Sequence, residues 1–144
     1  RQRQICIRDR TKVAPELSNE AHYYRAKAYL DAGKVEGAMD DLKILAKDTR
    51  NIYGAEAKYK VAQIYFDAGQ TEQAEKEVLD YIEVSTPHTY WLARSFVLLS
   101  DVYMKLGRNL DAKQYLLSLK QNYQADDDIA GMIESRLNKL NAEN

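Results

Sequence analysis

Few residues of this chain combine the type and the spacing that catalysis or metal binding requires. Its two histidines, His22 and His88, lie 66 residues apart. Neither belongs to an HExxH-like pair, so both are expected to be surface or helix-start residues. Cys6 is the only cysteine and has no neighbouring histidine, so it can form no internal disulfide or cysteine metal site. The aspartates at 126–128 lack the glycine and terminal glutamate of a calcium loop and are expected to cap a helix. We therefore expect no enzyme activity, no metal and no cofactor.

Charge and glycine content argue against phosphate and nucleic-acid ligands. No two of the six glycines lie within three residues of each other, so the chain has no glycine-rich phosphate loop. Residues 1–12 carry five basic side chains and one acid, which leaves residues 13–144 with a net charge of −5. A basic arm is typical of nucleic-acid contacts, but this one has no interleaved aromatic residue to stack on bases. We interpret residues 1–14 as the remnant of an upstream helix, in a fragment of a longer protein.

The composition indicates a soluble helical protein. Of the 144 residues, 45% are hydrophobic and 30% are charged, which suits a chain that buries a core. Only six glycines and two prolines are present, too few for a many-stranded β protein. No stretch approaches 18 consecutive apolar residues, so insertion into a membrane is not expected.

A repeated pattern of Tyr, Gly and Ala organises the chain. Each copy has a Tyr, a Gly four residues later and an Ala five residues after that, and the glycines lie 36 and 38 residues apart. Apolar residues recur at helical spacing on both sides of each glycine, and glycine can end a helix in the left-handed conformation. Each copy is therefore predicted to fold as two antiparallel helices. The copies are Tyr29, Gly33 and Ala38; Tyr65, Gly69 and Ala74; and Tyr103, Gly107 and Ala112.

The pattern predicts three hairpins and a final helix. The hairpins are assigned to residues 15–50, 51–86 and 87–124, and a capping segment to residues 125–144. Its apolar residues Ile129, Ile133, Leu137 and Leu140 form one stripe, which is expected to seal the third hairpin. The helices are expected over residues 15–32, 35–48, 52–68, 72–84, 87–106, 109–123 and 128–141.

Several polar and proline positions carry local predictions. Thr71 and Asn109 are expected to be N-caps, and Pro15 and Pro87 are expected in the first turns of their helices. Arg25 occupies a position that is apolar in the other copies, so we expect it to have an acidic partner or to be exposed. The adjacent residues Asp40 and Asp41 are assigned to a solvated helix face.

The repeated pattern resembles the tetratricopeptide repeat, a 34-residue helix–turn–helix unit. The resemblance covers residues 19–123, and the middle unit is the nearest to the family pattern. The family's late aromatic residue is replaced by leucine or valine, and its closing proline is present only as Pro87, one residue late. The resemblance implies an all-α, right-handed superhelical solenoid with a concave face. Its conserved small position in the first helix is occupied by Ala26, Ala62 and Ser100.

The resemblance also implies a binding face, because the first helix of each family unit lines the concave groove. Tyr23, Tyr59 and Phe66 are expected to form a contiguous aromatic strip there, flanked by Lys27 and Asp67. The groove positions also include Glu20, Leu30, Glu56, Arg94, Val97 and Met104. The candidate peptide-binding residues are Tyr23, Lys27, Asp31, Tyr59, Gln63, Phe66, Asp67, Asp101 and Lys105.

Two functional hypotheses follow. The first is an interaction module that binds a protein or peptide segment in its groove. The second is a structural segment of a longer solenoid whose binding site lies elsewhere. The family's clamp for C-terminal carboxylates needs Lys and Asn, but the matching positions hold Tyr23, Lys27, Tyr59 and Gln63, so that activity is not carried over. The end of the chain is similar to the ends of some bacterial cell-envelope proteins with these repeats, which favours periplasm or cell envelope over cytoplasm.

Overall fold

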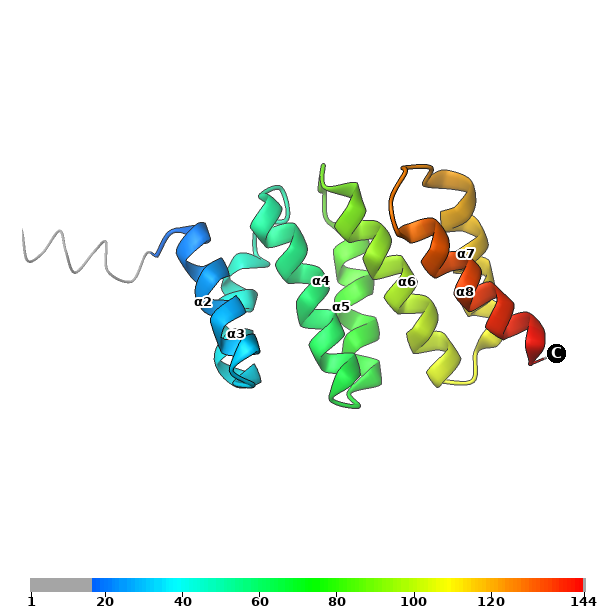
Figure 1. The fold of residues 1–144 in the computed structure, drawn as a ribbon, viewed down its shortest axis with the longest axis horizontal. Helices are drawn as coiled ribbons and strands as arrows, with labels where there is room; N and C mark the ends of the chain where they lie inside the picture. The colour runs from blue at the N-terminus through cyan, green and yellow to red at the C-terminus, as the bar shows by residue number, and fades with distance from the viewer. Residues whose placement is uncertain (1–16, 144) are drawn as a thin grey trace, which may run out of the picture.

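The computed structural model describes residues 17–143, which form seven α-helices and no strand. Figure 1 shows the helices stacked along one axis, with those of one layer in front of the other. The all-α repeat fold expected from the sequence is confirmed, and each helix begins and ends within a few residues of its expected bounds. The elements are α2 (Asn19–Asp31), α3 (Val35–Leu45), α4 (Ile52–Asp67), α5 (Thr71–Glu83), α6 (Thr89–Lys105), α7 (Asn109–Asn122) and α8 (Ile129–Ala142).

Three glycines form the tight turns inside the hairpins. Gly33, Gly69 and Gly107 have φ values of 76°, 80° and 77°, a region that side chains with a Cβ seldom adopt. At the second turn, the Gly69 amide donates to the carbonyl of Phe66 and the Gln70 amide donates to that of Tyr65. The repeated tyrosine thus also supplies the carbonyl that closes each turn.

The turns are shorter than expected, which corrects two assignments. The residue directly after each glycine is already the N-cap, so Gln70 and Arg108 precede α5 and α7. Thr71 and Asn109 are therefore the first helical residues and not the caps. Neither Gln70 nor Arg108 caps its helix with its side chain, because backbone bonds across the turn already fix the chain there.

Helix starts between hairpins depend on side chains. Ser18 caps α2 by accepting from the Ala21 amide, and Asn51 caps α4 by accepting from the Tyr53 amide. The placement of Pro87 inside α6 is wrong, because His88 is the N-cap of that helix. Thr86 Oγ1 accepts from the His88 amide and donates to the carbonyl of Thr49, which ties this loop to the preceding one. Pro15, Cys6 and the proposed helix remnant at 1–14 lie outside the described residues.

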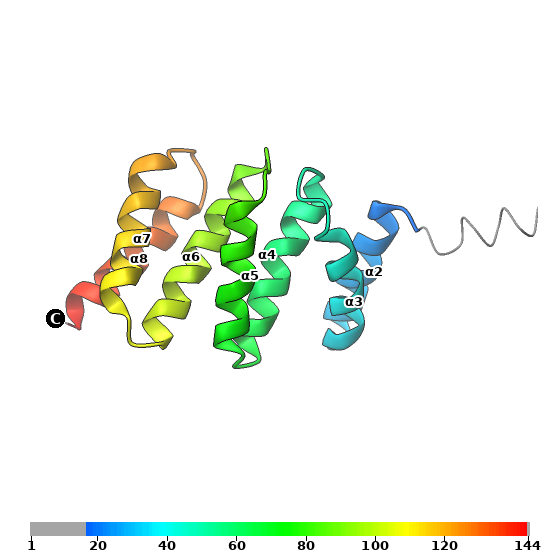
Figure 2. The same cartoon turned by 180° about the vertical axis from the view of Figure 1, so that it is seen from behind.

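The helices form two layers that curve. Helix α4 contacts α2 and α6, and α6 also contacts α8, whereas α3, α5 and α7 make no contacts with one another. Figure 2 shows α3, α5 and α7 in front of the other layer. Because the neighbours of only one layer touch, that layer lies on the inside of the curve. We call the side formed by α2, α4, α6 and α8 the inner face.

The core repeats with the sequence. Ala38, Ala74 and Ala112 are fully buried, so the second helix of each hairpin can approach the first closely. Tyr103 is buried, whereas Tyr29 and Tyr65, its equivalents in the other two copies, are only partly buried. Two clusters of buried residues meet at α4, which contributes to both of them. All three small positions, Ala26, Ala62 and Ser100, are buried.

The final helix seals the third hairpin as the sequence indicates. All four residues of its stripe, from Ile129 to Leu140, are buried, and α8 contacts both α6 and α7. Asp127 accepts a hydrogen bond from the Ile129 amide at 2.9 Å, so the acidic run satisfies one free amide at the helix start, although the N-cap residue Asp128 makes no side-chain capping bond.

Candidate functional site

The inner face begins with a polar contact between α2 and α4. The Tyr23 hydroxyl donates to the Glu56 carboxylate at 3.1 Å, and Lys60 forms an ion pair with the same carboxylate at 2.6 Å. The ammonium groups of Lys27 and Lys60 lie 5.3 and 5.8 Å from the centre of the Tyr23 ring. Burial, together with the Glu56 charge and hydrogen bond, raises the pKa of Tyr23 to about 12. Tyr23 is therefore a neutral hydrogen-bond donor at neutral pH.

A second set of contacts joins α4 to α6 through Tyr59. This residue is only 6% exposed, and its ring centre lies 5.6 Å from that of Trp91. The Tyr59 hydroxyl donates to Gln63 Oε1 at 2.8 Å and accepts from Arg94 Nη2 at 3.0 Å. Gln63 in turn donates to Asp67 at 2.8 Å. A line of hydrogen bonds thus follows the exposed side of α4 toward its C-terminal end.

Arg94 lies at the centre of a group of aromatic side chains. Its guanidinium carbon is 4.9 Å from the ring centre of Tyr59 and 5.9 Å from those of both Tyr90 and Trp91. Arg94 Nη1 donates to the Tyr90 hydroxyl at 3.0 Å, and that hydroxyl donates to Asp128 at 2.8 Å. We call Tyr59, Tyr90, Trp91 and Arg94 the Arg94 cluster.

The electrostatics of the Arg94 cluster keep its cation charged. Burial lowers the pKa of Arg94, but hydrogen bonds to Tyr90 and Tyr59 and the charges of these groups outweigh it, so the pKa is raised. Burial is also the largest cause of the raised pKa of Tyr90. The cluster therefore presents a cation bordered by hydroxyl groups and ring faces.

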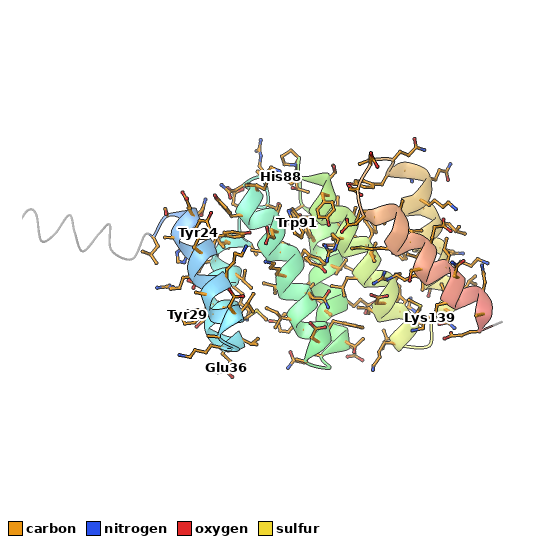
Figure 3. All side chains as sticks on the ribbon, in the orientation of Figure 1. Tyr24, Tyr29, Glu36, His88, Trp91 and Lys139 are labelled. Carbon is orange, nitrogen blue, oxygen red and sulfur yellow. The ribbon has the colours of Figure 1, made fainter. Side chains whose placement is uncertain are left out.

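The C-terminal ends of α4, α6 and α8 enclose a cavity of about 440 Å³ on the inner face. Phe66 and Met104 are its apolar lining residues, and Lys105 and Lys139 bring positive charge to it. Figure 3 labels Trp91 and Lys139, which lie on the side where α4, α6 and α8 face the viewer. Asp101 also lines the cavity and accepts two hydrogen bonds from Arg136, at 2.7 and 2.9 Å. The charge of Asp101 is therefore already paired with that of Arg136.

The three residues of the predicted aromatic strip lie in three different places on the inner face. Tyr23 contacts the rings of Tyr53 and Tyr24, whereas Tyr59 contacts Trp91. Tyr23 and Tyr59 share no aromatic contact. Phe66 lies farther along α4, in the cavity. The reason is that an aromatic ring of the following inner helix, Tyr53 of α4 or Trp91 of α6, lies beside each tyrosine.

The remaining predicted residues distribute over the same face. Lys27 packs over the Tyr23 ring, and Gln63 and Asp67 continue the line of bonds from Tyr59. Lys105 and Asp101 line the cavity. Asp31 is exposed at the end of α2. The structure thus brings Phe66, Asp101 and Lys105 together.

Sequence reasoning left several residues of this face out of the candidate set. Glu56 and Arg94 were placed in the groove by the repeat register but were not selected. Tyr90 and Trp91 received no role at all. A usable signal existed, because Trp91 is the only tryptophan and Tyr90 lies four residues before Arg94, which places the two on the same side of a helix.

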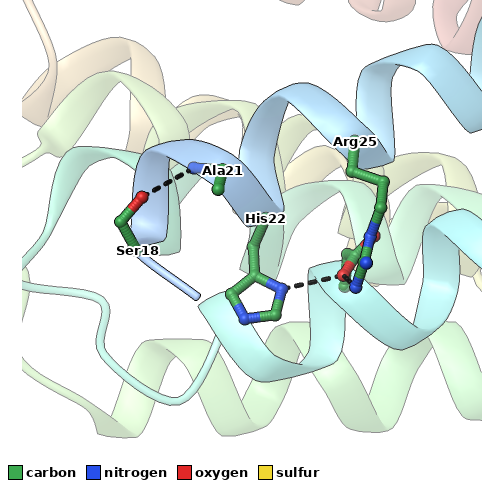
Figure 4. A network of polar contacts seen from close by, with 5 residues as sticks. Ser18, Ala21, His22 and Arg25 are labelled. Atoms are coloured by element: carbon green, nitrogen blue, oxygen red, sulfur yellow. Dashed lines mark hydrogen bonds and ion pairs between the residues drawn. The ribbon is translucent and has the colours of Figure 1, made fainter. Parts of the chain in front are cut away.

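A buried polar network in the first hairpin overturns two further expectations. Asp41 is only 1% exposed, although it was assigned to a solvated face. His22 is also buried, and its Nδ1 lies 2.8 Å from Asp41 Oδ1. Figure 4 shows His22 and Arg25 reaching from α2 toward the same group on α3. The expectation for Arg25 is confirmed, since it has both an acidic partner and a half-exposed side chain.

A cavity of about 410 Å³ lies on the opposite side of the molecule, with residues of α3, α4 and α5 in its lining. Lys58 lies within it and forms ion pairs with Glu77 at 3.1 Å and Asp80 at 2.7 Å. Burial lowers the pKa of Lys58, but these two acids outweigh the effect and leave it raised. The buried cation is therefore already neutralised by its own neighbours.

Within residues 17–143, no three His, Cys, Asp or Glu side chains gather in an arrangement that would hold a metal ion. Within the same residues, every helix is too short or too polar to cross a membrane.

Two segments of the chain match family models described as tetratricopeptide repeat. They are residues 20–48, which contain all but the first residue of α2 and all of α3, and residues 93–122, which contain most of α6 and all of α7. The hairpin of α4 and α5 lies between the two matches and has the same glycine turn. No curated protein and no solved structure matches the chain. Tetratricopeptide repeats are generally protein-interaction modules and typically act as non-enzymatic scaffolds. The matches do not bear on the likeness to cell-envelope proteins.

Proposed function

We propose that this chain, which belongs to the tetratricopeptide repeat family, is a non-enzymatic interaction module that holds a segment of a partner protein along its inner face. The observation that carries the proposal is the cavity at the ends of α4, α6 and α8, with Phe66 and Met104 in its lining. It lies on the concave side, where a bound segment can contact several helices at once. An apolar side chain of the partner would insert there as the anchor.

Charged groups around the cavity would orient the bound segment. Lys105 and Lys139 line it, and Asp67 lies at the end of α4 beside the cavity residue Phe66. Toward the first hairpin, Lys27 and Asp31 are exposed on α2. Opposite charges on a binding face determine the register and direction of a partner more than its affinity. We expect a dissociation constant in the micromolar range, which corresponds to a binding free energy of about −8 kcal/mol.

Only part of the predicted residue set suits a mutational test. Tyr59 belongs to the buried core cluster, so its removal would disturb folding as well as binding. Phe66 and Met104 are only partly buried and are the better choice. Leu79 of α5 and Val84, the residue that ends α5, serve as a matched control pair on the outer layer, because both are exposed.

The test is a peptide-display selection on the immobilised chain, followed by affinity measurements with the selected peptides. The Phe66→Ala/Met104→Ala variant should weaken binding about tenfold or more, because it removes the apolar anchor site. The Leu79→Ala/Val84→Ala variant should bind as the wild type does. If both double variants lose the same affinity for the selected peptides, or if both bind them as well as the wild type does, the binding site lies elsewhere.

The second candidate function is a structural segment within a longer solenoid. Exposed apolar residues at both ends of the stack favour it: Leu17 and Tyr24 at the first hairpin, and Leu110 and Leu117 on α7. In that case neighbouring repeats of the parent protein would cover these surfaces. The selection separates the two functions. Selected peptides that bind at the end surfaces, and whose affinity is unchanged in the Phe66→Ala/Met104→Ala variant, would support the structural segment.

A further inference from the structure

We propose that Arg94 binds the carboxylate of an aspartate or glutamate side chain in the partner segment, so that the natural ligand is an acidic peptide. This inference rests on the proposed function, because it assigns a ligand chemistry to the same inner face. It adds a polar anchor point, the Arg94 cluster, to the cavity farther along α6.

The structure holds the Arg94 guanidinium in a fixed orientation. Nη1 donates to Tyr90 and Nη2 donates to Tyr59, both at 3.0 Å. Tyr59, Tyr90 and Trp91 border the guanidinium with their rings. An arginine that is already ordered loses little side-chain entropy when an anion binds its remaining N–H groups. This is the arrangement that favours recognition of a planar carboxylate.

No carboxylate of the described residues forms an ion pair with Arg94, in contrast to three other arginines. Arg25 pairs with Asp41, Arg108 with Asp111 and Arg136 with Asp101. The acid nearest to Arg94 along its hydrogen bonds is Asp128, and it is reached only through the Tyr90 hydroxyl.

The partial burial of Arg94 makes the lack of a carboxylate partner among the described residues significant. Arg50, by comparison, lies on an exposed loop, where water solvates its charge. Arg94 is partly buried among rings that supply no full negative charge. A partly desolvated cation without a counter-ion gains more from an incoming carboxylate than an exposed one does.

The spacing along α6 predicts the form of the ligand. Arg94 and Met104 are ten residues apart on this helix, which corresponds to about 15 Å along its axis. An extended peptide covers about 3.3 Å per residue. The acidic residue and the large apolar residue of the ligand should therefore lie about four or five positions apart. The cavity end adds no further charge preference, because Lys105 and Lys139 line it together with Asp101 and Glu143.

The test uses the full chain and the display selection described above, with selected peptides synthesised in C-terminally amidated form. The peptides are compared with versions in which the acidic residue is replaced by its amide, Asp by Asn or Glu by Gln. Binding is measured to the wild type, to Arg94→Gln and to Arg108→Gln. Arg108 is the matched control, because it also stacks on a tyrosine, 4.3 Å from the Tyr103 ring, but already has acidic partners.

We expect an acidic residue four or five positions from a large apolar one among the selected peptides. Conversion of that acid to its amide should weaken binding to the wild type and to Arg108→Gln by about tenfold or more. The same conversion should change binding to Arg94→Gln by less than about twofold. The amide comparison on the wild type tests the proposal even where Arg94→Gln fails to fold.

Three results would overturn the proposal. Selected peptides without an enriched acid would overturn it and leave the proposed function standing, as would an amide effect of equal size in Arg94→Gln. A selection that yields no binding peptide would overturn the proposed function and this inference together.

Discussion

Arg25 donates two hydrogen bonds to Asp41 across the first hairpin, from Nε to Oδ2 at 2.8 Å and from Nη2 to Oδ1 at 2.7 Å. This fork explains how a cation occupies a position that holds Val61 and Leu99 in the other hairpins. The Arg25 side chain is half exposed, and its carboxylate partner is buried. The pair joins α2 to α3 where the other hairpins use apolar contact.

The first prediction concerns the loss of this carboxylate. Asp41→Asn should lower the free energy of unfolding by about 2–3 kcal/mol, because it weakens the bonds to Arg25 and removes the charge that faces buried His22. The measurement is urea denaturation followed by circular dichroism at pH 7. Asp40→Asn is the matched control on the exposed neighbour and should change stability by less than about 0.5 kcal/mol. If the two variants lose the same unfolding free energy, the contacts of Asp41 with Arg25 and His22 do not stabilise the fold.

The second prediction concerns acid. The hydrogen bonds from Arg25 hold the pKa of Asp41 below its ordinary value; burial opposes this shift and His22 adds to it. A depressed pKa contributes stability that is full above the unfolded-state pKa and is lost as the pH falls through the folded-state pKa. The stability difference between the wild type and Asp41→Asn should therefore narrow below about pH 4. Denaturation curves between pH 5.5 and 2.5 check this, and a constant difference would exclude linkage to Asp41.

The third prediction concerns Gly54. A Cβ on this residue would lie 2.5 Å from the carbonyl oxygen of Leu45 and would also meet that of Asp48. Both atoms belong to the backbone, which cannot rotate away as a side chain can. Gly54→Ala should therefore lower the free energy of unfolding by more than about 3 kcal/mol.

The control for this change is Gly131→Ala in α8. No atom lies within 4 Å of the Cβ position of Gly131, so this alanine should stabilise the helix by about 0.5–1 kcal/mol. Thermal melts of both variants provide the comparison. A Gly54→Ala protein as stable as the wild type would mean that α3 and α4 pack less closely at this point.

The fourth prediction concerns the final helix. Ile133→Ala should cost about 2–5 kcal/mol, because the side chain is buried in the core cluster shared by α6, α7 and α8. Leu110→Ala on α7, 70% exposed, should have almost no effect. If Ile133→Ala melts as the wild type does, α8 does not stabilise the third hairpin.

Local signals allowed the sequence by itself to determine the hairpins. Gly33, Gly69 and Gly107 end their helices through a backbone conformation that only glycine adopts cheaply, and this property belongs to the residue alone. Helical periodicity depends likewise on residues three and four apart. The stripe of α8 could therefore be read from four residues of one segment, and its burial is confirmed.

The tertiary structure alone decided which polar side chains meet. Arg94 contacts Tyr59, 35 residues away on another helix, and Asp41 is buried because Arg25 and His22 of α2 reach it. Such contacts depend on how two helices cross and on the side-chain rotamers at the crossing, which no single segment encodes. For the same reason the tyrosines at 23 and 59, equivalent in the repeat, acquired different ring neighbours. The residue that fills the space beside each one comes from the next inner helix, where the repeats differ in sequence.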